Sequence, residues 1–212
     1  IECFNCGEDQ VIETPYLSEF NFIKPKLSKL ELTNALIELN KIAKKNSEEG
    51  AKANYLLGNF YYNTTTLGYY RYLLTFDHNN GNGPKYNNYG DEYEATNNFF
   101  YKSFGWGGNY VDNFSPSENY LKKAFASTTN REMKAQLLFA LSKNEQGRFY
   151  NAKDPVLKKL YENQYDNEAK ILGYKVVNYR SYFKDLKQYA DTKAYKETKS
   201  NCKYFDYYTN NY

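Results

Sequence analysis

The chain has 212 residues, which suits one domain or one stretch of a repeat array with a buried core. Its net charge of +3 comes from 28 basic and 25 acidic residues in a mixed order, so no basic footprint for nucleic acid is present. No apolar run approaches the roughly 18 residues that span a bilayer, and no signal peptide is visible. Because the first residue is Ile1 rather than Met, we expect a processed or excised piece of a longer protein.

An N-terminal extension, residues 1–26, carries a C-x-x-C motif formed by Cys3 and Cys6. The motif is compatible with half a zinc site, a redox pair or a disulfide. A zinc site would need two more ligands, and the only other cysteine and histidine in the sequence are the isolated Cys202 and His78. A redox site would need a strand before the motif and a helix after it, and neither is indicated. We therefore predict a structural disulfide or idle thiols, with the zinc half-site as the weaker alternative; a disulfide would favour the cell envelope or the exterior.

Residues 27–76 are predicted to form the first helices. Apolar residues recur there at helical spacing, and Ser47 with the acids that follow it ends one helix and begins the next. The first stripe comprises Leu32, Ala35, Leu36, Leu39, Ile42 and Ala43, and the second Ala53, Leu56, Leu57, Phe60 and Tyr61.

Residues 77–113 are predicted to be an insertion rich in Asn, Gly and aromatic residues. A long insertion in a helical array is usually functional or disordered. Its rings exceed what core stripes need, and exposed Tyr and Trp suit contacts with peptides or sugars. The candidate interaction surface comprises Tyr86, Tyr89, Tyr93, Tyr101, Trp106 and Tyr110.

Residues 114–212 predict further helices. One is expected to start near Ser115, and another runs from Asn130 to Gly147, where the glycine would end it. Asp154 followed by proline predicts a third start. Apolar residues from Ala169 to Ala190 alternate steps of three and four, which predicts one long helix or two closely joined ones. β-branched alternation is scarce, so the fold class is all-α.

Several fragments resemble tetratricopeptide (TPR) repeats. The segment from Leu57 to Tyr61 is similar to the L-G-x-x-Y pattern of a first helix, in which the glycine admits a facing helix and the tyrosine covers the crossing. Residues 120–130 resemble a second helix with its exit turn, and residues 134–144 the next first helix. Leu172-Gly173 repeats the Leu-Gly pair, and residues 182–197 resemble the turn between TPR helices, with Ala190 in place of proline.

This resemblance implies antiparallel helix pairs in a fragment of a TPR-like, right-handed α-solenoid, interrupted by the insertion. It implies a concave surface that docks proteins. The chain also resembles the C-terminal parts of long, uncharacterised Tyr- and Asn-rich envelope proteins of Bacteroidota. These resemblances place the protein in the cell envelope or outside the cell, with an unidentified protein partner.

Candidate catalytic patterns are weak. His78 follows Asp77, but no nucleophile stands in a recognisable elbow, so the pair predicts a solvated loop. The same loop lacks the glycine and the closing glutamate of a calcium site. We therefore predict a non-enzymatic protein-interaction scaffold without cofactors. The alternative is a carbohydrate-binding accessory module that stacks sugars on the rings of the insertion.

Overall fold

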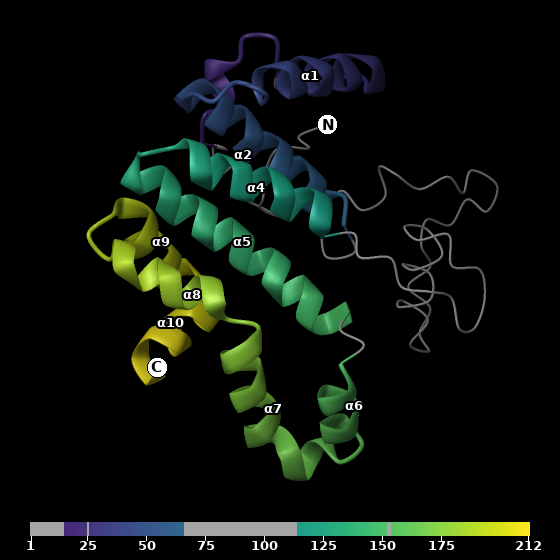
Figure 1. The fold of residues 1–212 in the computed structure, drawn as a ribbon, viewed down its shortest axis with the longest axis vertical. Coiled ribbons are helices and arrows are strands. Elements are labelled where there is room, and N and C mark those ends of the chain that lie inside the picture. Colours follow the sequence, from purple (N-terminus) through teal and green to yellow (C-terminus); the bar gives the residue numbers. More distant parts are fainter. Residues whose placement is uncertain (1–14, 25, 66–113, 152–153) are drawn as a thin grey trace, which may run out of the picture. The chain divides into compact units, whose positions relative to one another are not determined.

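The computed structural model describes residues 15–24, 26–65, 114–151 and 154–212 (Figure 1). Over these ranges the chain forms nine α-helices and two short 3-10 helices and contains no strand, which confirms the all-α prediction. The chain divides into two compact units, residues 1–124 and 125–212, and each is described by itself.

The first unit contains the 3-10 helix η1 (Leu17–Glu19), the helices α1 (Lys29–Ile42) and α2 (Glu48–Asn63), and all but the last turn of α4 (Ser115–Ser127). Side chains define where α1 and α2 begin. Ser28 and Glu31 form a reciprocal capping box, and the Ser47 hydroxyl accepts a bond from the Gly50 N–H. Asn54 then fastens the connection, because its amide donates to the carbonyls of Ala43 and Gly50 at 2.9 and 2.8 Å.

Gly58 lies where α2 contacts α4. A methyl group on Gly58 would lie 2.6 Å from the Leu121 side chain, and the Ser117 hydroxyl donates to the Gly58 carbonyl at 2.7 Å. The Tyr61 ring stacks on Tyr120, with centroids 5.3 Å apart and an interplanar angle of 3°. The predicted close crossing at this glycine, covered by a tyrosine one turn later, is confirmed as local geometry.

The second unit is built on α5 (Arg131–Asn151). It continues with α6 (Pro155–Tyr161), α7 (Gln164–Asn178), α8 (Ser181–Leu186), the 3-10 helix η3 (Lys187–Tyr189), α9 (Lys193–Asn201) and α10 (Lys203–Asn211). The prediction that Gly147 ends a helix is wrong, because α5 runs through it to Asn151. Of the two alternatives for residues 169–190, the structure has two separate helices, α7 and α8.

The C-terminal layer, α8 to α10, covers part of α5 through one apolar cluster (Figure 1). Phe183 is central to it, since its ring lies 5.0 Å from that of Phe205 and 5.5 Å from that of Tyr208. The buried members are Ala135, Leu138, Phe183, Leu186, Ala194, Phe205 and Tyr208. Burial of this cluster is the main force that holds the layer to α5.

Two glutamates of α5 also satisfy the starts of helices in that layer. Glu145 accepts bonds from the N–H and hydroxyl of Ser181 at 2.9 and 2.6 Å and from the Tyr182 N–H at 3.3 Å. Glu132 accepts from the first two N–H groups of α9. Carboxylates placed at helix N-termini satisfy free donors and complement the helix dipole. They therefore fix where α8 and α9 start along α5.

Candidate functional site

The interaction surface predicted on the insertion lies outside the described residues. This holds for Tyr86, Tyr89, Tyr93, Tyr101, Trp106 and Tyr110, and equally for Cys3, Cys6 and His78. Cys202 is a half-buried free thiol between α9 and α10. Within the described ranges, no group of three or more potential metal ligands comes together.

A helical hairpin formed by α6 and α7 carries an open groove among the described residues. Asp154 caps α6, because one carboxylate oxygen accepts from the N–H groups of Val156 and Leu157 at 2.9 and 3.3 Å. The predicted helix start at Asp154 is therefore confirmed. At the other end, the Asn167 amide donates to the Leu160 carbonyl at 3.1 Å, so a side chain of α7 satisfies the last turn of α6.

Asp154 also ties the two helices together at the base of the hairpin. Its second oxygen accepts from the hydroxyls of Tyr174 and Tyr179 at 2.7 and 3.2 Å. The hydrogen bond from Tyr174 is the main cause that lowers the pKa of Asp154, and the same bond raises the pKa of Tyr174. Burial, followed by the bond to Asp154, raises the pKa of Tyr179 to about 12. At neutral pH Asp154 is therefore ionised, and its carboxylate accepts hydrogen bonds from two tyrosine hydroxyls at this end of the hairpin.

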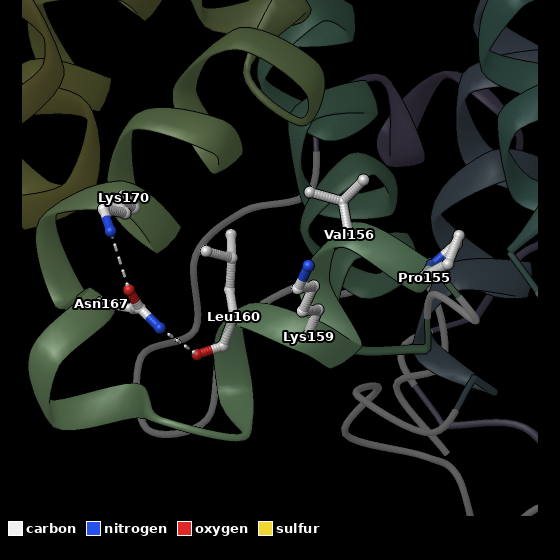
Figure 2. A pocket seen from close by; sticks show the side chains of 6 residues that line it. All are labelled: Pro155, Val156, Lys159, Leu160, Asn167 and Lys170. Carbon is white, nitrogen blue, oxygen red and sulfur yellow. Dashed lines mark hydrogen bonds between the residues drawn. The ribbon is translucent and has the colours of Figure 1, made fainter.

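A groove of about 390 Å³ runs between the helices and is lined by Pro155, Val156, Lys159, Leu160, Asn167 and Lys170 (Figure 2). Leu160 and Asn167 are half-buried, whereas the other four residues are exposed. Its apolar surface comes from Pro155, Val156 and Leu160, and Lys159 and Lys170 add two ammonium groups. An open apolar groove with a few polar groups is a common form of binding site.

α7 is only partly covered. None of its described side chains, from Tyr165 to Asn178, is buried. Tyr165 and Val177 keep 90% and 78% of their surface exposed. A methyl group on Gly173 would meet nothing within 4 Å, so the close helix crossing predicted at Leu172-Gly173 is wrong. The stripe of α7 has helical spacing, but no described helix presses on this glycine.

Lys175 lies on α7 between two aromatic faces. Its ammonium is 4.4 Å from the centroid of Phe149 and 5.7 Å from that of Tyr204. Burial, followed by repulsion from Arg180, lowers the pKa of Lys175 to about 8. The aromatic faces attract the charged form and moderate this shift. Lys175 therefore marks the place where the hairpin enters a desolvated environment.

Comparisons of the chain with protein-family models, with curated proteins and with solved structures found no match. The fold class rests on the helices themselves, and the TPR-like arrangement and a bacterial envelope origin stay predictions. None of the helices in the described ranges is long and apolar enough to cross a membrane.

Sequence reasoning missed the groove because the stripe of α7 looks like any other core stripe. Ala169 and Leu172 recur at the helical spacing of a core stripe, yet both are exposed. The sequence pattern that could have indicated the groove is the pair of lysines, Lys159 and Lys170, which lie next to apolar residues on a short helix and on the helix that follows it. It could not be interpreted without knowing that α6 and α7 pair with each other and bury so little.

Proposed function

We infer that the protein is a non-enzymatic scaffold that binds a protein partner, and that the α6–α7 hairpin carries a docking surface. One observation carries this proposal: the hairpin combines an open apolar groove with a helix that has no buried described side chain. Apolar side chains left on the surface of a folded protein are a common mark of interaction sites.

The construction of the hairpin supports this function. Asp154 and Asn167 satisfy the ends of α6 from within the hairpin, so polar contacts of its own side chains help to fix its geometry. A pre-formed surface loses less conformational entropy on binding than a surface that must fold first. The alternative, a carbohydrate-binding module, stays a prediction, because its rings lie outside the described residues.

A photo-crosslinking experiment tests the proposal in the cells that make the protein. A benzophenone amino acid would replace Val156 in the groove, and a control variant would carry it at Leu30 on α1. Both positions are well exposed, at 47% and 71%. We expect a discrete crosslinked protein from position 156 and none from position 30.

Specificity for the groove is tested with a second substitution, Leu160→Asp, in the variant crosslinked from position 156. Leu160 lines the groove, so a charge there should remove the crosslinked product while the circular dichroism spectrum stays helical. Equal crosslinking from positions 156 and 30, or a product that persists in the helical Leu160→Asp variant, would contradict the proposal.

A further inference from the structure

The two lysines of the groove belong to those helix lysines that form no ion pair with a described carboxylate, whereas other lysines do. Several lysines pair with a carboxylate one turn away, including Lys41 with Glu38 at 2.6 Å and Lys45 with Glu49 at 3.0 Å. Lys193 pairs with Glu197 in the same way. Such pairs are the ordinary arrangement on an exposed helix face.

Lys159 and Lys170 have acids at the same spacings but form no ion pair with them in the part of the chain that the structure describes. Glu162 lies three residues after Lys159, and Asp166 lies four residues before Lys170. Lys170 instead donates to the Asn167 side chain at 3.2 Å. Two ammonium groups therefore border the groove with no carboxylate within pairing distance among the described residues.

Between these charges the groove offers apolar surface of limited size. A volume of about 390 Å³ accommodates one or two aliphatic side chains, and Pro155, Val156 and Leu160 supply contacts for them. The exposure of four of its six lining residues leaves the groove open to an approaching chain. A long lipid tail would leave most of its length in water here, so the groove suits a peptide better.

We propose that the groove between α6 and α7 binds an acidic peptide segment of the partner, with an aliphatic side chain seated on Pro155, Val156 and Leu160 and neighbouring carboxylates paired with Lys159 and Lys170. This rests on the proposed function and names the chemistry of the partner. Charge complementarity selects the acidic segment, and the apolar contact supplies most of the affinity.

A random peptide library displayed on phage, selected on the full chain, is the probe. We expect the enriched peptides to combine Leu, Ile or Val with flanking Asp or Glu. The best peptide, labelled with a fluorophore, should bind the wild-type chain and weaken as NaCl is raised, because salt screens exposed charges. The double variant Lys159→Glu/Lys170→Glu should weaken it at least tenfold.

A matched control reverses two exposed lysines of the C-terminal layer, in Lys184→Glu/Lys203→Glu. It changes the net charge by the same amount but leaves the groove intact, so it should weaken binding less than threefold. Equal losses in the two double variants would mean that binding follows overall charge, and the proposal would be overturned.

Two further outcomes separate this inference from the proposed function. One outcome is that the peptides bind the Leu160→Asp variant weakly but bind the Lys159→Glu/Lys170→Glu variant as tightly as the wild-type chain. The groove would then remain a docking site, but its proposed preference for acidic peptides would be overturned. If the peptides bind the Leu160→Asp variant as tightly as the wild-type chain, the groove is not their binding site, and the proposed docking function of the groove is overturned. Displacement of the peptide by decanoate or by phosphatidylglycerol vesicles at similar concentration would assign the groove to a lipid and overturn the proposal.

Discussion

The C-terminal layer and the α6–α7 hairpin are both built from short helices, yet they are held in different ways. α8 to α10 bury one apolar cluster against α5, and Glu132 and Glu145 fix two of their helix starts. The hairpin is joined by polar contacts of Asp154 and Asn167 and buries Leu157 of α6, whereas its long helix α7 buries no described side chain. Helical periodicity in the sequence and burial in the fold are therefore separate properties, and the helices that bury least keep most of their surface exposed.

The largest effect should come from truncating a leucine in each region. Leu186 is fully buried in the layer, whereas Leu172 on α7 is 37% exposed. Leu186→Ala should lower the free energy of unfolding by about 3 kcal/mol, because it removes contacts and leaves a cavity. Leu172→Ala should cost about 0.5 kcal/mol or less. Urea unfolding measures both, and similar losses would erase the distinction between the regions.

The next effect concerns the carboxylate at the start of α8. Glu145→Ala leaves two N–H groups and one hydroxyl of Ser181 and Tyr182 without this acceptor, and should cost about 2 kcal/mol. The matched control is Glu168→Ala on the exposed surface of α7, which should change stability by less than about 0.5 kcal/mol. A loss at Glu145 as small as that at Glu168 would show that the layer is held by apolar burial alone.

Substitution of two glycines by alanine should change the free energy of unfolding in opposite directions. Gly58→Ala places a methyl group 2.6 Å from the Leu121 side chain, so overpacking should cost about 1–2 kcal/mol. Gly173→Ala adds a methyl group in open space on a helix and should stabilise by about 0.5–1 kcal/mol, because alanine favours helix more than glycine does. Thermal unfolding of the two variants gives both signs. A destabilising Gly173→Ala would reveal a helix packed on the hairpin.

The last effect is a dependence of the free energy of unfolding on pH, caused by Lys175. The folded state holds its proton with a pKa of about 8, against 10.5 for an ordinary lysine. Below pH 8 Lys175 is charged in both the folded and the unfolded state, and the cost of burying its charge destabilises the folded state. Between pH 8 and 10.5 it is mainly neutral in the folded state and charged in the unfolded state, so this cost decreases as the pH rises. Lys175→Met should thus stabilise at pH 7, and this gain should shrink by about 1 kcal/mol by pH 10, since partial exposure screens the effect.

The comparison variant for that measurement is Leu172→Ala, on the same helix, which removes no titratable group. Its effect on the free energy of unfolding should be the same at pH 7 and pH 10. If the effect of Lys175→Met is equally constant, the attraction of the rings of Phe149 and Tyr204 cancels the cost of burial.

The sequence by itself determined the helices, because their signals are local. The spacing of apolar residues and the caps at Ser47 and Asp154 act within a few residues, and they are confirmed. The close approach at Gly58 is confirmed too, but only the tertiary structure shows that α4 is the helix that makes it. Tertiary structure alone decided which stripes became core. The apolar residues of α7 recur with the same period as those of α5. Whether they are buried depends on which helices pack together, and the periodicity of the sequence does not reveal contacts between distant segments. The α6–α7 groove appeared only with that pairing, since its apolar walls and its two lysines come from separate helices.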